Sequence, residues 1–118
     1  MYTLFGIKNC NTVKNAVDWL KANNISFEFH DYKKLGVSVN QLTDWHKQVN
    51  SINELINTKG TTWKQLPDEE KKLSSVEQAM QLMQEKTSVI KRPIITDANG
   101  KIIVIGFNEA NYQSIFKL

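Results

Sequence analysis

Residues 2–32 read YTLFGIKNCNTVKNAVDWLKANNISFEFHDY, and the elements they predict set the topology of the chain. Tyr2–Phe5 is a short apolar run closed by Gly6, a pattern typical of a buried strand that enters a turn. Ile25–Tyr32 alternates apolar and polar side chains and is expected to form a second strand. Between them lie residues at helical spacing, which are Val13, Ala16, Val17 and Leu20.

Asn11 or Thr12 is expected to cap the N-terminus of this helix, and the pair Asn23-Asn24 to end it. A strand, a helix and a strand within about thirty residues predict a βαβ unit. Its two strands should run parallel with a right-handed crossover, because an antiparallel pair would need only a hairpin.

From Leu35 to about Lys86 the pattern changes to short helical pieces that Asn, Thr, Gly and Pro separate. The expected pieces are helices at Val39–Val49, Thr61–Leu66 and Ser74–Gln84, with a turn near Ser51–Leu55. We therefore predict a single domain over residues 1–118, with a helical insertion at about residues 35–88.

The last part of the chain predicts two strands and a helix. Ile94–Thr96 and Lys101–Ile105 flank an Asn-Gly turn, which is a strong signal for an antiparallel hairpin. Gly106 should end the second strand, and Asn108 should cap a terminal helix. The side chains of that helix available to pack on the sheet are Ala110, Ile115 and Phe116.

The order is thus βαβ, a helical insertion, then ββα. Pro93 stands at the start of the third strand, where proline is tolerated only if the strand begins at an edge or the preceding peptide bond is cis. Together these features predict an α/β, thioredoxin-like fold: a four-stranded mixed sheet with an inserted helical lobe.

Composition narrows the class of protein. The chain has 118 residues, of which 41% are apolar and 23% charged, as in ordinary globular domains. No apolar run approaches the roughly 20 residues of a membrane span, and the N-terminus lacks a signal-peptide pattern. A net charge of +3 with interspersed acidic residues gives no support to nucleic-acid binding. We expect a cytoplasmic monomer that binds neither nucleic acid nor a membrane.

Cys10 is the only cysteine, and it precedes the predicted helix directly. Backbone N–H groups and the helix dipole stabilise an anion at that position, and Lys8 and Lys14 add positive charge nearby. A thiol of pKa 8.5 is only about 3% ionised at pH 7, so a lowered pKa would favour a nucleophile. The alternative is a small packing residue. Val13 stands where a CxxC motif would place a second cysteine, so any disulfide of Cys10 must join another molecule.

Arg92, the only arginine, directly precedes Pro93. In a thioredoxin-like fold the residue before a cis proline faces the cysteine, where a guanidinium could bind an oxyanion or a carboxylate of glutathione bidentately. The alternative is an exposed arginine that merely follows Lys91.

The segment from Asn57 to Trp63 is a polar turn that leads into a helix. Lys59 can contribute charge there, and Thr61 or Thr62 can cap the helix, although an ordinary loop explains each residue equally well. His30 and His46 have no partners at metal-ligand spacing, so we assign no metal.

Five segments in this order resemble the ArsC family of arsenate-reductase and Spx-related thioredoxin-like proteins, closest to its YffB branch. The resemblance covers essentially the whole chain. The segments are Gly6–Lys14, Phe29–Tyr32, Asn57–Lys64, Ile90–Pro93 and Ile105–Phe107.

The resemblance implies thiol chemistry with Cys10 as the nucleophile, no bound cofactor and glutathione as co-substrate, with glutaredoxin as a further partner. In arsenate reductases of this type, three arginines hold the oxyanion. Arg92 matches one of them, Lys59 stands where the second is usual, and Phe107 and Asn108 follow Gly106 where the third would be. Lysine cannot reproduce a guanidinium fork, so the resemblance favours thiol chemistry over arsenate reduction.

Three functions follow from these observations. The leading one is a glutathione-dependent monothiol reductase in which Arg92 and Lys59 hold the substrate and the backbone N–H groups of Asn11 and Thr12 stabilise the thiolate. The second is an Spx-like regulator that binds RNA polymerase, although Val13 removes the CxxC switch of such proteins. The third is a redox-inert relative that only binds a partner.

Overall fold

The computed structural model describes residues 1–117, which form two compact units. The first unit combines Met1–Leu35 with the chain from Arg92 onward, and the second is Gly36–Lys91. The first contains the sheet, and the second is built from short helices. Each is described by itself.

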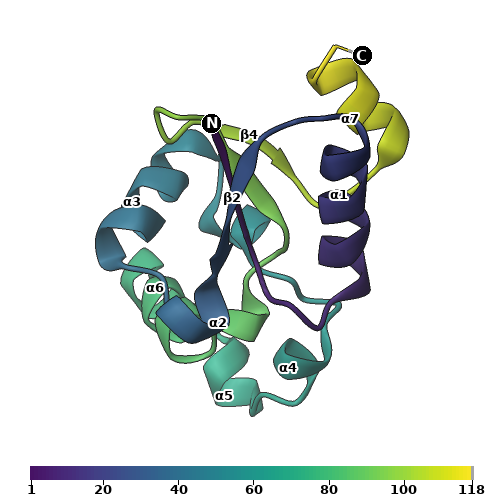
Figure 1. The fold of residues 1–118 in the computed structure, drawn as a ribbon. Helices are drawn as coiled ribbons and strands as arrows, with labels where there is room; N and C mark the ends of the chain where they lie inside the picture. Colours follow the sequence, from purple (N-terminus) through teal and green to yellow (C-terminus); the bar gives the residue numbers. More distant parts are fainter. Residues whose placement is uncertain (118) are drawn as a thin grey trace. The chain divides into compact units, whose positions relative to one another are not determined.

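The first unit contains a four-stranded mixed sheet in the order β2-β1-β3-β4 (Figure 1). Its strands are β1 (Tyr2–Gly6), β2 (Phe27–Asp31), β3 (Ile94–Thr96) and β4 (Ile102–Ile105). β1 pairs with β2 in parallel, and β3 pairs antiparallel with both β1 and β4. The predicted βαβ unit and C-terminal hairpin are therefore confirmed, as is the thioredoxin-like mixed sheet.

The register brings three chain segments to one end of the sheet. Gly6, the last residue of β1, lies opposite Asp31, the last of β2. Phe5 lies opposite Ile94, the first residue of β3, because β3 runs the other way. The loop after β1, the start of α2 (Tyr32–Leu35) and the Arg92-Pro93 segment before β3 therefore lie at the same end of the sheet.

Helices α1 (Asn11–Ala22) and α7 (Glu109–Ile115) pack on one face of this sheet. The buried residues shared between them and the strands are Leu4, Val13, Ala16, Trp19, Leu20, Ile95, Val104 and Tyr112. Burial of a large aliphatic or aromatic side chain contributes about 1.5–3 kcal/mol, so this cluster is the main source of stability in the unit.

Helix ends agree with the sequence in part. Asn23 caps the C-terminus of α1 and Asn24 takes a positive φ of 57°. The Asn108 side chain accepts a hydrogen bond from the N–H of Asn111, as expected. The prediction of Asn11 or Thr12 as the first cap was wrong: Cys10 itself occupies the N-cap of α1, since the helix begins one residue earlier than its apolar pattern indicates.

The packing of α7 also needs one correction. Ile115 and Phe116 lie against the buried cluster as expected, but Ala110 is exposed. The residue that anchors the helix is Tyr112, which is fully buried, stacks edge-on against Trp19 at 5.4 Å and donates a hydrogen bond to the carbonyl of Gly106 at 2.5 Å. Gly106 has a φ of 88°, which favours glycine at this turn.

The second unit consists of short helices. They are α3 (Val39–Gln48), α4 (Thr61–Lys64), α5 (Asp68–Lys71) and α6 (Val76–Glu85), with 3₁₀ turns η1 (Ile52–Leu55) and η2 (Thr87–Val89). An antiparallel bridge between Ile56 and Ile90 joins the chain just after η1 to the chain just after η2. Gly60, not Thr61 or Thr62, holds the N-cap position of α4, where a Cβ would meet the Asn57 amide at 2.9 Å.

We expect Tyr112→Phe to lower the free energy of unfolding by about 0.5–1.5 kcal/mol, because it removes the hydrogen bond to the Gly106 carbonyl but keeps the ring. Tyr112→Ala should cost about 3–5 kcal/mol, because it also leaves a cavity in the cluster. Urea unfolding followed by circular dichroism measures both. Equal losses for the two variants would contradict the assignment of Tyr112 as a packing anchor.

Candidate active site

Cys10 lies at the N-terminus of α1, packed half-buried against the hydrophobic cluster of the first unit. Its backbone is extended, with φ −130° and ψ 122°, and its carbonyl accepts the first helical hydrogen bond from the N–H of Lys14 at 2.9 Å. The sulfur thus takes the place of the polar side chain that usually caps a helix. It makes no full capping hydrogen bond, yet the N–H groups of Val13 and Thr12 interact with it.

The pKa of the Cys10 thiol is lowered from its usual value. Burial of the sulfur raises the pKa, but the backbone N–H of Val13, the hydrogen bond and positive charge of Arg92, and the N–H of Thr12 together outweigh that cost. Each of these groups stabilises the thiolate more than the neutral thiol. The site therefore favours an ionised sulfur, which is the form that reacts as a nucleophile.

Arg92 supplies the side-chain donor. The Arg92–Pro93 peptide bond is cis, and β3 is a central strand, so the edge-strand alternative for Pro93 does not apply. The guanidinium is half-buried and hydrogen-bonds both the Cys10 sulfur and the Tyr32 side chain. Burial lowers the pKa of Arg92, but these two partners more than compensate and raise it. The prediction that Arg92 faces Cys10 is confirmed, since the two side chains are in hydrogen-bond contact.

Tyr32 is a member of the site that the sequence reasoning did not single out. It is the first residue of α2, directly after β2, and its side chain is fully buried. Burial raises the pKa of Tyr32 to about 12, despite the opposing charge of Arg92 and its hydrogen bond. The phenol therefore stays protonated at neutral pH. Its oxygen accepts a hydrogen bond from the guanidinium but carries no negative charge that would neutralise it.

The other residues assigned from the sequence are placed as follows. Thr12 is exposed at the second position of α1 and contributes its N–H to the sulfur. Asn11 is the first helical residue and is also exposed, so the part expected of its N–H stays a prediction. The N–H of Val13 was not expected; helix geometry could have indicated it, because donors at the second and third helical positions point toward the N-cap.

Lys59 belongs to the second unit, so its part in the chemistry of Cys10 stays a prediction. There it is exposed, and its N–H donates to the Asn57 carboxamide at 3.2 Å. It lines a pocket of about 580 Å³ with two other lysines, Lys71 and Lys91.

No cluster of three or more metal-binding side chains occurs within residues 1–117. Over the same residues, no helix is long and apolar enough to cross a membrane.

Comparison with known proteins places this geometry in context. The model of the ArsC family matches residues 5–115. The structure is similar to that of a YffB protein, with a TM-score of 0.86, 32% identity and 98% of each chain covered. It is also similar to an arsenate reductase (ArsC) related protein from Brucella melitensis, with a TM-score of 0.77, 38% identity and coverage of 99% of this chain and 95% of that one.

A third relative is of another kind. The sequence is 30% identical over 110 residues to the global transcriptional regulator Spx of Streptococcus agalactiae, covering 92% of this chain and 78% of that protein. The relatives therefore include both reductase-like and regulatory proteins.

The lowered pKa predicts how fast Cys10 reacts at each pH. We expect alkylation by iodoacetamide to titrate with a midpoint clearly below 8.5, the value of a free thiol, because the sulfur ionises more readily in this site. Intact-mass spectrometry at pH 5–10 measures it. A midpoint at or above 8.5 would show that burial dominates and that Cys10 is a packing residue.

Two variants separate the causes of that shift. Arg92→Ala removes the hydrogen bond and the positive charge that Arg92 supplies to the Cys10 sulfur, so it should raise the midpoint of alkylation. Tyr32→Phe keeps the aromatic ring and the guanidinium, so it should move the midpoint less. A midpoint that is the same in all three proteins would contradict the role of Arg92.

Proposed function

The chain belongs to the ArsC family of arsenate-reductase-like and Spx-related proteins, and from that premise we propose that it is a glutathione-dependent monothiol reductase with Cys10 as its nucleophile. The observation that carries the proposal is the lowered pKa of the Cys10 thiol beside Arg92. A half-buried sulfur held as a thiolate by a guanidinium suits disulfide exchange better than packing.

The proposed reaction exchanges one disulfide for another. The Cys10 thiolate attacks the glutathione sulfur of a mixed disulfide R–S–SG, forming Cys10–S–SG and releasing the thiolate R–S⁻, which takes up a proton. The thiolate of a second glutathione then attacks Cys10–S–SG, forming oxidised glutathione and regenerating the Cys10 thiolate. The net change is that R–S–SG and one glutathione thiol become R–SH and oxidised glutathione.

Arg92 has two tasks in this scheme. It stabilises the Cys10 thiolate, and its remaining N–H donors bind a carboxylate of glutathione. Lys59 adds positive charge for the anionic partner, while the N–H groups of Asn11 and Thr12 stabilise the thiolate with that of Val13. Glutaredoxin is the proposed second reductant. No bound cofactor is needed, and we propose that the protein works as a cytoplasmic monomer.

Arsenate is a poor substrate in this proposal. It carries negative charge on several oxygens, and holding it against a thiolate of like sign needs several directional donors. The chain offers one guanidinium, since Arg92 is the only arginine, and lysine supplies a point charge without a fork. Phe107 and Asn108 after Gly106 supply no positive charge.

A second candidate function is transcriptional regulation, which the similarity to Spx supports. A regulator of this kind would bind RNA polymerase. Val13 stands at the CxxC position, so this chain could not use an internal disulfide as its redox switch. A third candidate, a redox-inert protein that only binds a partner, would not need the lowered pKa of Cys10.

Steady-state kinetics with excess glutathione and glutaredoxin tests the leading proposal. We expect reduction of a glutathionylated peptide faster than glutathione and glutaredoxin alone achieve, loss of that added rate in Cys10→Ser, and arsenate turnover that is weak or absent. Arg92→Ala should reduce kcat/KM by about 5- to 150-fold, equivalent to about 1–3 kcal/mol of transition-state binding. Arsenate turnover as efficient as that of the mixed disulfide would overturn the proposal.

The pH of the assay separates the two tasks of Arg92. Above the pKa of Cys10 in every variant, the sulfur is fully ionised, so any remaining defect of Arg92→Ala reports lost substrate binding. Arg92→Lys keeps the charge but loses the fork, and it should recover part of the rate at neutral pH. Recovery of the full rate would contradict bidentate binding.

A further inference from the structure

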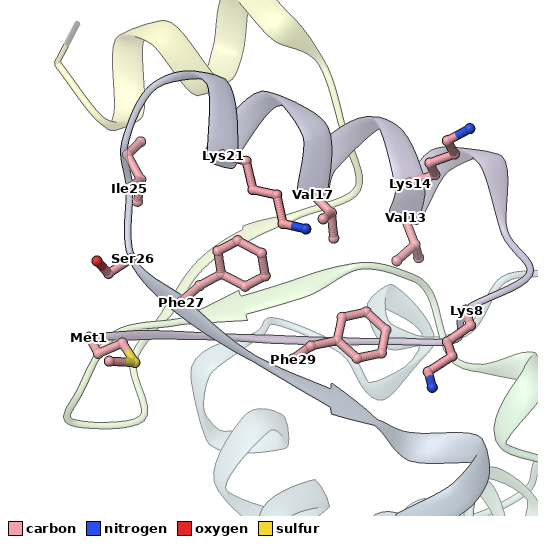
Figure 2. A pocket seen from close by; sticks show the side chains of 10 residues that line it. All are labelled: Met1, Lys8, Val13, Lys14, Val17, Lys21, Ile25, Ser26, Phe27 and Phe29. Atoms are coloured by element: carbon pink, nitrogen blue, oxygen red, sulfur yellow. The ribbon is translucent and has the colours of Figure 1, made fainter.

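The first unit also carries a concave site whose lining includes neither Arg92 nor Tyr32. It is a groove of about 790 Å³ between α1 and β2, shown in Figure 2. Phe27 and Phe29 of β2 form one side, and Val13 and Val17 of α1 face them from the other. All four are apolar, and the two rings are only half-buried. The groove thus leaves aromatic surface open to an occupant.

One wall of the groove is an edge strand. β2 is the outermost strand in the order β2-β1-β3-β4, so within residues 1–117 only one of its sides is paired. The N–H of Tyr2 bonds the carbonyl of Ser26 at 3.4 Å, and Tyr2 lies opposite Phe27. In a parallel pair the residues that bond the neighbour alternate with residues that face away. The backbone N–H and C=O groups of Phe27 and Phe29 therefore face outward at this edge.

The charges at the groove are all of one sign. Lys8, Lys14 and Lys21 line it, and no aspartate or glutamate among residues 1–117 does. Figure 2 shows the Lys21 side chain reaching from α1 toward Phe27, and Lys8 at the end of the groove near Phe29, while Lys14 points away from the strand. One ammonium group, that of Lys21, thus lies beside Phe27, and a second, that of Lys8, lies near Phe29 at one end of the groove.

We propose that this groove binds an extended, acidic segment of a partner protein that adds a fifth strand to the sheet along β2. Backbone groups of the segment would pair with those of Phe27 and Phe29, as in other complexes formed by strand addition. Every second side chain of the segment would then enter the groove. The chemistry of the walls selects an acidic, an apolar and an acidic side chain at three successive groove-facing positions.

The spacing agrees with this assignment. Groove-facing residues of an extended segment lie about 6.6 Å apart, so the two acidic residues are separated by about 13 Å. Phe27 and Phe29, two residues apart, occupy about 6.6 Å of that length. Lys8 lies near Phe29 at one end of the groove and Lys21 reaches toward Phe27, and these long, flexible side chains can cover the difference.

Other occupants fit less well. A second copy of this chain would bring its own three lysines against these lysines, and like charges oppose that contact. A fatty-acid anion would satisfy the lysines and the rings but would leave the outward backbone groups of β2 without partners. A peptide segment satisfies the apolar surface, the charges and the strand edge together.

The test uses a fluorescent peptide with the core Glu-Ser-Leu-Thr-Glu, which places Glu, Leu and Glu on one face. Fluorescence anisotropy with the full chain measures its affinity. The matched control peptide has the core Ser-Glu-Leu-Glu-Thr, with the same composition but both glutamates on the opposite face. We expect the first peptide to bind at least tenfold more tightly. Equal affinity, or no binding of the first peptide at millimolar concentration, would overturn the proposal.

Protein variants locate the contact. Lys21→Glu should weaken binding of the first peptide by about 3- to 30-fold, the range for losing one ion pair and gaining one repulsion. Replacing the peptide's glutamates by lysines should reverse the preference toward Lys21→Glu. Lys101→Glu, a charge reversal on the exposed Lys101 of the hairpin, is the control and should change nothing. An equal effect of the two variants would point to non-specific charge attraction and refute the site.

Hydrogen exchange tests the strand addition itself. Bound peptide should slow amide exchange at Phe27 and Phe29, because their N–H groups would become paired. Binding without such protection would refute strand addition. A peptide methylated at the backbone nitrogens that face β2 should lose affinity, whereas methylation of the alternate nitrogens should be tolerated. None of these measurements uses Cys10, so failure here leaves the proposed reductase function intact, and the reverse also holds.

Discussion

The contact of the Arg92 guanidinium with the Cys10 sulfur and the Tyr32 side chain is the constraint on which the site depends. The three residues are far apart in the sequence and follow or precede three different strands. The sheet brings them together because β1 and β2 run parallel and β3 runs the other way, so two strand ends and one strand start coincide. A mixed sheet of this order is what allows one arginine to reach both partners.

The electrostatic balance at Cys10 explains why that arginine matters. Packing against the hydrophobic cluster removes water from the sulfur, which by itself raises the pKa of the thiol. The N-terminus of α1 supplies two backbone donors, and Arg92 adds a formal charge. Tyr32 accepts from the same guanidinium while staying neutral, because burial raises its pKa to about 12. The full positive charge of Arg92 is therefore available to the thiolate.

Much of the fold was predictable because it is encoded in local patterns. The alternation in β2, the Asn-Gly turn between β3 and β4 and the Asn108 cap each act within a few residues, and all are present. Predictions failed where several local solutions compete. The start of α1 was misplaced because a cysteine at the N-cap carries no capping signal. Ala110 was wrongly expected to pack on the sheet because α7 is short, and Tyr112 is the residue that it buries.

The site divides along the same line. Cys10 and Arg92 could be identified from their neighbours, a helix start and a proline. Tyr32 could not, because it stood at the end of an alternating pattern that is equally compatible with an exposed strand end, and only the tertiary structure buries it.

The groove between α1 and β2 could not be predicted from the sequence either. Its lysines are distributed over a loop and two turns of a helix, and its aromatic wall follows from the position of β2 at the edge of the sheet. A strand edge has no sequence signature of its own, since the same alternating residues serve in a central strand when a neighbour is present. The charge beside this edge is what narrows the choice of partner: Lys8, Lys14 and Lys21 line the groove with the half-buried rings, so in the proposed complex they favour an acidic segment over other strands that could pair with β2.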